Sequence, residues 1–355
     1  MRRTAEWVWY DAGAAAAAVR SALAPLAGLF GAVVRRRNAG FDRRVAPSVL
    51  PALSIGNLTV GGTGKTPVAS WFAQRLMQGG AHPAIVLRGY GDDEWRVHRL
   101  LTPEVPVVTN ADRLSAMVTA KDAGADCVVL DDAFQHRRAG RVSDIVLVSA
   151  DRFAPHVRLL PAGPYREGLD ALRRATAVIV TVKAADAQAV AAVEAAVRAA
   201  APHTPVAVVK LVPGRLRRVV ATPDELDVSE NTGVDQPPAW FMGRRVLLVS
   251  AIADASAFER QVVADGARLV RHARFPDHHD FTEREVARLV TAAREADVVL
   301  CTLKDAVKLG PRWPRAATPL WYVSQTLVVD RGAEILEREC ARVLAAREAT
   351  VPTAG

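Results

Sequence analysis

Glycine, lysine and threonine follow one another in a run that suits phosphate binding. The run is Gly61-Gly62-Thr63-Gly64-Lys65-Thr66, and it comes after the apolar segment Leu50–Ile55. In a turn that opens a helix, backbone amides can wrap phosphates, a lysine neutralises the β- and γ-oxygens, and a threonine hydroxyl binds Mg²⁺. The strict motif has a glycine where this chain has Thr59. A glycine-rich turn without a ligand is the alternative, but this order of residues favours a nucleotide site.

Two carboxylates end a second apolar run. Asp131 and Asp132 follow Cys127-Val128-Val129-Leu130 directly, and Gln135 lies on the same turn. Acids at the carboxyl end of a buried strand face a phosphate loop across a parallel sheet, where they hold Mg²⁺ directly or through water. Many strands end in an acid, so it is the phosphate loop upstream that makes this pattern a predicted metal site.

Three further clusters have residue types that could do chemistry. Acids follow an arginine and two glycines in Arg88–Glu94, and Leu160–Glu167 is a proline-bearing loop that ends in a charged pair. The third cluster is Asp277-His278-His279-Asp280. It lacks further ligands at the spacing of a transition-metal site, so a histidine held by a carboxylate for acid–base work is favoured. A solvated loop remains the alternative.

The elements that must position these residues alternate in type. Apolar β-branched runs alternate with helical stretches from residue 49 onward, which is typical of a parallel sheet covered on both faces. The chain is polar and rich in proline and glycine between 213 and 243, which predicts a domain boundary. The predicted strands are 51–56, 83–87, 105–109, 126–130, 144–149, 177–182, 205–211, 246–251, 268–274, 297–301 and 319–324. The predicted helices are 66–78, 111–122, 184–200, 254–265, 282–294 and 332–346.

Charge and cysteine usage exclude several classes of protein. Of a net charge of +8 over 355 residues, the first 50 carry +5, because they hold eight arginines and three acids. The near-neutral remainder argues against a protein that grips nucleic acid. Cys127, Cys301 and Cys340 share no CxxC spacing. They form no disulfide framework, and we expect the first two, which lie in apolar runs, to be buried thiols in a reducing compartment.

The basic amino terminus is also apolar. Leucine, phenylalanine and valine recur at intervals of three and four between Leu23 and Val33, which predicts a helix beginning near Pro25. Arg35-Arg36-Arg37 follows at once, and an apolar stripe that ends in arginines is the pattern of a helix in a membrane interface. A helix packed on the protein's own core, a single membrane span and a signal peptide are alternatives. Acids ahead of the apolar run disfavour the signal peptide.

Taken in order, these motifs resemble those of the tetraacyldisaccharide 4'-kinase (lipid A 4'-kinase) family. The resemblance runs from about residue 20 to 325. It includes a residue other than glycine at Thr59, so the departure from the strict motif does not count against nucleotide binding. The segments that carry it are Ser54–Pro67, Leu87–Gly91, Asp131–His136, Leu160–Glu167, Phe275–His279 and Thr302–Lys308.

The resemblance implies an α/β fold and a reaction. It implies a P-loop NTPase-type parallel-sheet domain and a smaller Rossmann-like α/β domain, with a membrane-associating helix at the amino terminus. The predicted boundaries are 1–45 for the helical region, 46–215 for the nucleotide domain, 216–243 for the linker and 244–355 for the smaller domain. The implied activity is Mg²⁺-dependent transfer of the γ-phosphoryl of ATP to the 4'-hydroxyl of a lipid A disaccharide precursor. We further expect a monomer on the anionic, cytoplasmic face of the inner membrane, without nucleic acid as a partner.

Residue roles are implied by position in the family's motifs. The matching base is Asp93, with Asp92 as the alternative because the family's intervening stretch is missing here, and His278 would hydrogen-bond and tune that base. Lys65 would act on the phosphates as a catalytic residue. The implied nucleotide-binding residues are Thr59, Val60, Gly61, Gly62, Thr63, Gly64, Lys65 and Thr66. The implied metal-binding residues are Thr66, Asp131, Asp132 and Glu167, and the implied acceptor-binding residues are Arg113, Gln135 and Asn57.

Three rival functions are compatible with parts of this pattern. A P-loop switch ATPase, acting as a membrane-associated binding module, would hydrolyse nucleotide without a sugar acceptor. A cytosolic small-molecule kinase or ligase would leave the amino terminus unexplained. A family member that has lost catalysis with its shortened acid loop is the strongest rival.

Overall fold

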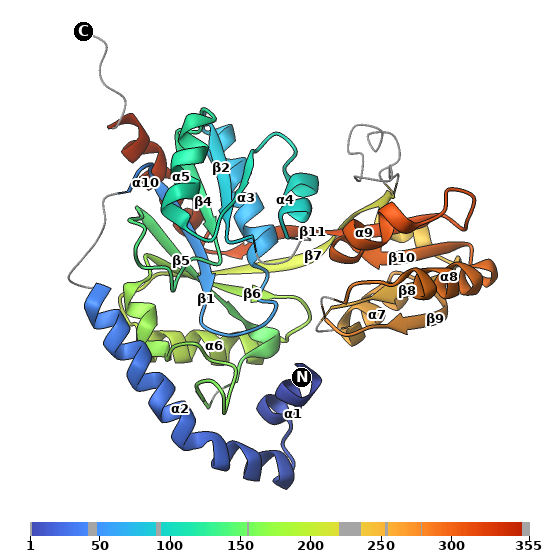
Figure 1. Ribbon diagram of the computed structural model, residues 1–355, viewed down its shortest axis with the longest axis horizontal. Helices are drawn as coiled ribbons and strands as arrows, with labels where there is room; N and C mark the ends of the chain where they lie inside the picture. Colours follow the sequence, from blue (N-terminus) through green and yellow to red (C-terminus); the bar gives the residue numbers. More distant parts are fainter. Residues whose placement is uncertain are drawn as a thin grey trace. The chain divides into compact units, whose positions relative to one another are not determined.

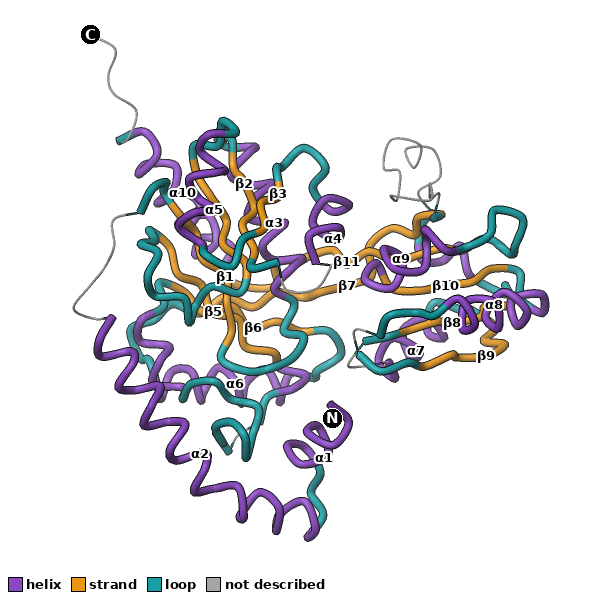
Figure 2. The backbone as a smooth tube through the Cα atoms, in the orientation of Figure 1, coloured by secondary structure: helices purple, strands orange, loops and turns teal. Residues whose placement is uncertain are grey.

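The structure is a computed structural model, and it describes residues 2–41, 48–89, 94–154, 156–219, 236–252, 255–277 and 279–349. The chain folds into two units. Unit 1 comprises 1–90, 104–211 and 327–355, and unit 2 comprises 91–103 and 212–326. Figures 1 and 2 show the elements of both units. The predicted domain boundaries remain predictions, and residues 220–235 of the predicted linker lie outside the described residues.

Unit 1 is built on parallel strands in the order β3-β2-β4-β1-β5-β6-β7. Every residue of β1, β2, β4 and β6 is buried, which requires cover on both faces of the sheet. Pairing of Ile55 in β1 with Asp131 in β4 sets the strand before the phosphate loop beside the strand that ends in acids. The strands are β1 (Ala52–Asn57), β2 (Pro83–Leu87), β3 (Val107–Thr109), β4 (Cys127–Asp131), β5 (Ser143–Ser149), β6 (Ala177–Val182) and β7 (Val206–Arg218).

Helices provide that cover. Met117 of α5 packs against Val128 and Leu130, so α5 covers the face to which alternate residues of β4 point. Valines of α6 pack in the same way against β5 and β6, and Figure 2 shows these helices around the strands of unit 1. The helices of unit 1 are α1 (Arg2–Tyr10), α2 (Ala14–Phe41), α3 (Lys65–Gln78), α5 (Arg113–Asp122), α6 (Ala187–Ala200) and α10 (Ala333–Glu348).

Unit 2 is a smaller α/β unit with the strand order β11-β10-β8-β9. Its pairs are parallel, and β7 and β11 both pass from one unit into the other. Its strands are β8 (Arg245–Ser250), β9 (Arg268–Arg274), β10 (Val298–Thr302) and β11 (Leu320–Arg331). Its α-helices are α4 (Glu94–Leu101), α7 (Ala255–Ala264), α8 (Glu283–Ala292) and α9 (Leu303–Leu309). Short 3₁₀ turns of unit 2 span Pro238–Phe241, Ala293–Glu295 and Gly310–Arg312, and those of unit 1 span Ala150–Arg152 and Leu169–Arg174.

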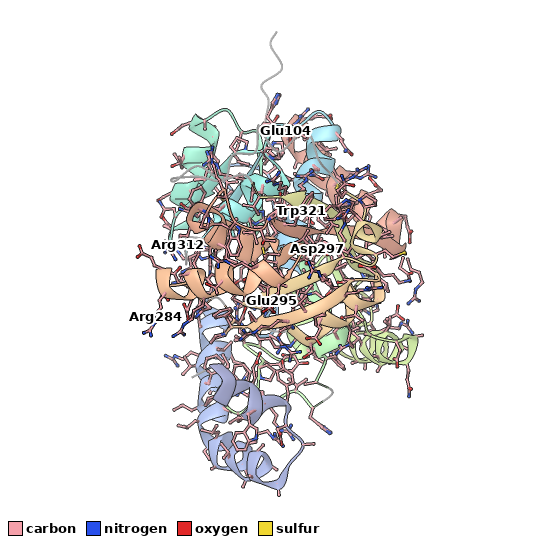
Figure 3. The ribbon with its side chains drawn as sticks, turned by 90° about the vertical axis from the view of Figure 1, so that its right-hand side faces the viewer. Glu104, Arg284, Glu295, Asp297, Arg312 and Trp321 are labelled. Atoms are coloured by element: carbon pink, nitrogen blue, oxygen red, sulfur yellow. The ribbon has the colours of Figure 1, made fainter. Side chains whose placement is uncertain are left out.

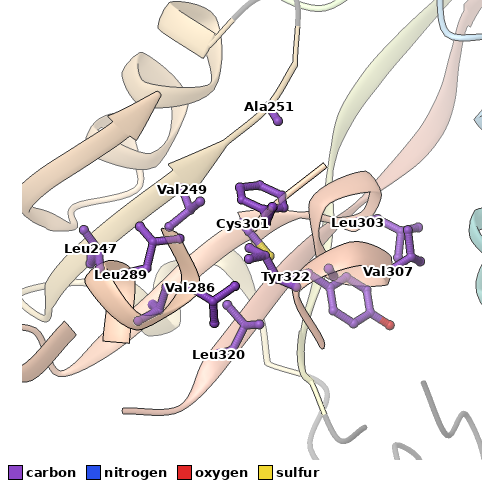
Figure 4. Packing of buried hydrophobic residues seen from close by; sticks show 14 of the residues in the cluster. Leu247, Val249, Ala251, Val286, Leu289, Cys301, Leu303, Val307, Leu320 and Tyr322 are labelled. Carbon is purple, nitrogen blue, oxygen red and sulfur yellow. The ribbon is translucent and has the colours of Figure 1, made fainter. Parts of the chain in front are cut away.

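The core of unit 2 has two clusters, one on each face of its strands. Figure 4 shows the first, in which Leu289 of α8 lies beside Leu247 and Val307 of α9 lies beside Tyr322. In the second, the rings of Trp240 and Trp321 lie 4.5 Å apart; Trp321 is labelled in Figure 3. Each face of the small sheet is therefore buried by its own set of side chains.

The predicted α/β class is confirmed, with local differences. Cys127 and Cys301 are buried as predicted. The helices α4 and α9, of eight and seven residues, were not predicted because they are too short to show a clear period. The prediction that the amino-terminal helix begins near Pro25 is wrong, since α2 begins at Ala14. The alanines ahead of the proline have the highest helix propensity, which outweighs the hydrogen bond that proline removes.

The surface of α2 is mostly exposed. Only Ala16, Ala27 and Gly31 of its 28 residues are buried, whereas Leu26 and Leu29 are 54% and 64% exposed. Of the apolar stripe, Leu26 and Val33 are exposed and Leu23 and Phe30 are half-buried, which argues against the alternative in which the stripe is buried on the protein's own core. By length and composition α2 could also cross a membrane, and its apolar, exposed surface fits membrane association.

Candidate active site

The backbone of the loop between β1 and α3 takes shapes that favour glycine. Gly61 and Gly64 have φ angles of 125° and 85°, in the left-handed range that side chains disfavour. A Cβ at Gly64 would also lie 2.2 Å from Cδ1 of Leu211. No side chain caps the start of α3 at Lys65, so the amides of its first turn remain available to an anion such as phosphate.

Neighbouring elements hold this loop at three points. The amide Nδ2 of Asn57 donates to Oγ1 of Thr63 at 3.0 Å. The hydroxyl of Thr181 donates to the carbonyl of Thr63, also at 3.0 Å. Earlier in the loop, Thr59 pairs with Tyr165 in an antiparallel bridge. The loop is therefore fixed by β1, by β6 and by the segment before Glu167.

Asp132 joins the phosphate loop to the segment that ends at Glu167. Its Oδ1 lies 3.6 Å from Nζ of Lys65, and Nη1 of Arg166 donates to both of its carboxylate oxygens at 3.1 and 3.3 Å. Burial favours the neutral form of Asp132, but the charges of Lys65 and Arg166 outweigh it and hold its pKa below the usual value. A carboxylate thus faces the loop lysine, as expected at a nucleotide–metal site.

Three of the residues predicted to hold Mg²⁺ are buried. They are Thr66 at the start of α3, Asp131 at the end of β4, and Glu167. Oε2 of Glu167 accepts from Arg174 and Asn38, both at 2.8 Å, while its buried Oε1 has no hydrogen-bond partner. Within the described residues no three His, Cys, Asp or Glu side chains form a metal cluster. This donor set fits Mg²⁺, which proteins commonly hold through one or two carboxylates and the phosphates of a substrate.

The predicted acceptor-binding residues lie close to one another but are largely engaged. Nε2 of Gln135 donates to the carbonyl of Asn57 at 2.8 Å, and Nη1 of Arg166 donates to Oε1 of Gln135 at 3.4 Å. Asn57 is fully buried behind the loop. Arg113 is buried as well, and its Nη2 donates to the carbonyl of Asp131 at 3.2 Å. In these contacts the three residues brace the end of β4 and the phosphate loop.

Burial and positive neighbours also act on His136. Its pKa falls to about 4 because the ring is desolvated and the charges of Arg113 and Arg141 oppose protonation. The imidazole beside Gln135 is therefore neutral at physiological pH and adds no positive charge to the site.

The predicted base and its partner lie outside the described residues. This holds for Asp93, for its alternative Asp92, and for His278. Their assignment therefore remains a prediction.

Sequence reasoning missed residues that reach the site from far along the chain. Arg166 was noted only as part of a charged pair, yet it pairs with Asp132. From α2, Asn38 donates to Glu167, and Nη2 of Arg37 donates to the carbonyl of Gln135 at 3.5 Å. Nη1 of Arg152 lies 3.5 Å from where a Cβ of Gly61 would be. For Arg166 the available signal was its place in the Leu160–Glu167 motif, which does not identify its partner. The other three residues lie outside the motifs, so nothing in the sequence pointed to them.

Three comparisons with known proteins agree. A family model described as tetraacyldisaccharide-1-P 4'-kinase matches residues 19–103 and 93–341. The tetraacyldisaccharide 4'-kinase of Anaeromyxobacter sp. (strain Fw109-5) is 36% identical, over 84% of this chain and 85% of its own length. That of Geobacter sulfurreducens is 33% identical, over 86% and 88%. The crystal structure of LpxK from Aquifex aeolicus in complex with ATP superposes with a TM-score of 0.70 at 25% identity, over 92% of this chain and 99% of that one.

Proposed function

The chain belongs to the tetraacyldisaccharide-1-P 4'-kinase family, and from that premise we propose how its own residues perform the reaction. It is an ATP- and Mg²⁺-dependent phosphotransferase of lipid A biosynthesis. It transfers the γ-phosphoryl group of ATP to the 4'-hydroxyl of a tetraacylated glucosamine disaccharide 1-phosphate. The family membership supports this reading over a switch ATPase or a member without catalysis.

One contact supports the assignment of the phosphate site above all others. Nζ of Lys65 lies 3.6 Å from Oδ1 of Asp132, which joins the lysine of the glycine loop to the acid at the end of β4. Phosphoryl transfer needs positioning and neutralisation of charge more than covalent help. The uncapped amides of α3 and the Lys65 ammonium would bind the phosphates of ATP and stabilise the charge that develops on them.

The carboxylates beside Lys65 would hold the metal. Asp131, Asp132 and Thr66 offer the hard oxygen atoms that Mg²⁺ prefers, and Glu167 offers its second carboxylate oxygen. Bound there, Mg²⁺ would neutralise negative charge on the phosphate oxygens. Arg166 would keep Asp132 ionised and oriented, because it donates to both oxygens of that carboxylate.

The remaining roles rest on the resemblance alone. Asp93, or Asp92 after the shortened loop, would take the proton of the acceptor's 4'-hydroxyl, and His278 would orient that carboxylate. Gln135, Arg113 and Asn57 would position the acceptor, Arg113 by meeting its 1-phosphate. In the described contacts these three side chains brace the loop, so binding of the acceptor would require them to exchange partners.

The amino-terminal helices would hold the enzyme on the membrane that contains its lipid substrate. Apolar side chains of α2 are exposed, among them Val33 at 59%, and three arginines follow in the same helix. Apolar burial and attraction to anionic lipids act together in interfacial helices. We therefore propose a peripheral or monotopic enzyme on the cytoplasmic face of the inner membrane, acting as a monomer.

The test is transfer of labelled γ-phosphate from ATP to a tetraacylated disaccharide 1-phosphate in mixed micelles. The wild-type protein should form a labelled lipid, and Lys65→Ala should reduce kcat at least about 100-fold, as expected when a donor to transition-state charge is removed. Lys121→Ala, at the exposed end of α5, is the matched control and should behave as wild type. ATP hydrolysis without any labelled lipid would contradict the proposed acceptor.

A further inference from the structure

A groove separate from the phosphate site lies between α2 and the segment 157–162. Its volume is about 400 Å³, within the range of about 300–1,000 Å³ that holds small ligands. No acid occurs among its ten lining residues, all of them described. One wall is made by small residues of α2, Ala17, Ala24 and Gly28 among them, and the other by Val157, Leu159 and Ala162.

The second wall is held in place without a ligand. The amide of Gly163 donates to the carbonyl of Leu159 at 2.9 Å, and the amide of Tyr165 donates to the carbonyl of Arg158 at 3.2 Å. Leu159 packs against Gly31 of α2, where a Cβ would stand 2.7 Å from its Cδ1. The indole of Trp9 in α1 donates to the carbonyl of Pro161 at 3.0 Å. The groove is therefore preformed, which reduces the entropic cost of filling it.

The wall is continuous with the phosphate site. Tyr165, whose amide closes the turn that begins at Arg158, also pairs with Thr59 at the start of the phosphate loop. The next residue, Arg166, donates to Asp132. On the other wall, α2 rises about 15 Å from Gly28 to Asn38, and Asn38 donates to Glu167. Both walls thus lead from the groove to residues of the candidate active site.

Charge at the groove indicates what kind of molecule enters it. Arg20 lines the groove, and its guanidinium is fixed because Nη1 donates to the carbonyls of Val8 and Asp11, both at 2.7 Å. Arg158 is exposed at the other wall. An apolar channel flanked by guanidinium groups, with no acid in its lining, complements an apolar chain that is attached to an anionic head.

We propose that this groove binds one acyl chain of the acceptor lipid. The inference rests on the proposed function, because only the acceptor carries its chains on the sugar whose 4'-hydroxyl must reach the phosphate site. That attachment raises the effective concentration of the chain at the groove, which favours it over chains of bulk membrane lipid. The groove then makes the enzyme sensitive to the length of that acyl chain.

Binding of the acyl chain in the groove should lower KM for the acceptor. Each methylene removed from water and buried should lower KM about fourfold until the groove is full. The value of kcat should not change, because the chain is bound equally in the ground state and the transition state. Acceptors with short, water-soluble acyl chains, used as monomers without detergent, give the series for this measurement.

Two glycines of α2 provide a matched pair of variants. Neither Gly28 nor Gly40 has an atom within 4 Å of an added Cβ, and leucine is a better helix former than glycine at both. Only Gly28 lines the groove. Gly28→Leu should raise KM for the longer acceptors about tenfold and flatten its dependence on chain length, without changing KM for ATP or for an acyl-free acceptor. Gly40→Leu should match the wild type.

A second pair tests the opposite wall at exposed positions that do not affect folding. Val157→Ser should weaken the dependence on chain length, whereas Val118→Ser, on α5 and exposed to a similar degree, should leave it unchanged. If KM for the acceptor depends on acyl-chain length equally in Gly28→Leu, Val157→Ser and the wild type, the proposal that this groove binds the chain is wrong. The proposal is also wrong if KM depends on the chain length of added phospholipid instead of that of the acceptor. A wild-type protein that phosphorylates no acceptor of any length would overturn the proposed function, and this inference with it.

Discussion

Asp132 is the residue on which the contacts of the candidate site converge. It has a φ of 49°, in a region that asparagine and aspartate tolerate better than other side chains with a Cβ. Its carboxylate meets Lys65 from α3 and Arg166 from the segment after β5. A carboxylate with two positive partners is kept ionised, so it can serve a metal ion and the lysine at once.

Asparagine at this position should preserve the backbone and remove the charge. We expect Asp132→Asn to weaken binding of Mg²⁺–ATP about 10–100-fold, the usual effect of losing a residue that supports a metal. Titration of activity with Mg²⁺ at saturating ATP measures this. Asp122→Asn, at the exposed end of α5, is the control. An unchanged Mg²⁺ titration in Asp132→Asn would remove Asp132 from the proposed metal site.

At the scale of elements, a fully buried acid of α10 connects that helix with the start of β5 in unit 1. Oε2 of Glu339 accepts from the hydroxyls of Ser143 at 2.6 Å and Thr176 at 2.5 Å. Glu339 is 0% exposed, whereas its neighbour Glu337 pairs with Arg75 at the surface. The two acids on one helix therefore have very different environments.

Replacing each acid by alanine should reveal this difference as unequal losses of stability. Glu339→Ala removes the acceptor that the buried Ser143 hydroxyl shares with the half-buried Thr176 hydroxyl. Because Thr176 can still donate to the carbonyl of Asp144, we expect a loss of about 1–3 kcal/mol in the free energy of unfolding. Glu337→Ala removes only an exposed ion pair and should cost less than about 1 kcal/mol. Urea denaturation followed by circular dichroism gives both values. If the two variants lose the same stability, the buried acceptor is not what attaches α10.

The contacts of the segment from Thr302 to Lys308 also indicate what that segment does. Sequence reasoning gave it no firm role. In the structure it forms the start of α9, where Oγ1 of Thr302 accepts from the amide of Asp305 and Oδ1 of Asp305 accepts from the amide of Ala251 at 3.1 Å. Burial raises the pKa of Asp305 to about 6. These contacts connect α9 with the end of β8 and indicate a structural role.

At the scale of the whole molecule, charge and apolar surface are concentrated in one part of the chain. The first 50 residues hold +5 of the net charge of +8, and they include the exposed apolar residues of α2. Asn38 at the end of the same helix contacts Glu167. The part of the chain proposed to meet the membrane is thus in direct contact with the candidate active site.

Membrane binding should depend on both properties of α2. The triple variant Leu26→Gln, Leu29→Gln and Val33→Gln should bind anionic vesicles at least about tenfold more weakly, because it removes apolar surface that the interface would bury. Raising the salt from about 0.1 M to 1 M should also weaken binding of the wild type. Flotation with vesicles measures both effects.

The control for this experiment changes the same number of exposed apolar side chains elsewhere. Val118, Val263 and Val328 are 45%, 49% and 46% exposed and lie outside α2. Their replacement by glutamine should leave vesicle binding unchanged. Equal binding of the α2 variant and the wild type would show that α2 does not anchor the protein.

The sequence by itself determined the features that depend on neighbouring residues. The phosphate loop was readable because glycines that permit left-handed backbone lie next to the lysine of α3. The order of strands and helices was readable from the hydrophobic period, and the uninterrupted apolar run Cys127–Leu130 predicted that β4 is covered on both faces. Each of these signals is local, so it needs no knowledge of distant parts of the chain.

Only the tertiary structure decided which distant side chains meet. Asp132 and Arg166 are 34 residues apart, and Asn38 and Glu167 are 129 apart. The assignment of α4 to unit 2 is also invisible in the sequence, because α4 lies between two strands of unit 1. Such contacts depend on how loops return to the sheet edge, and a side chain's type states its chemistry but not its partner. The phosphate loop is therefore a property of the sequence, and the acid–arginine bridge beside it is a property of the fold.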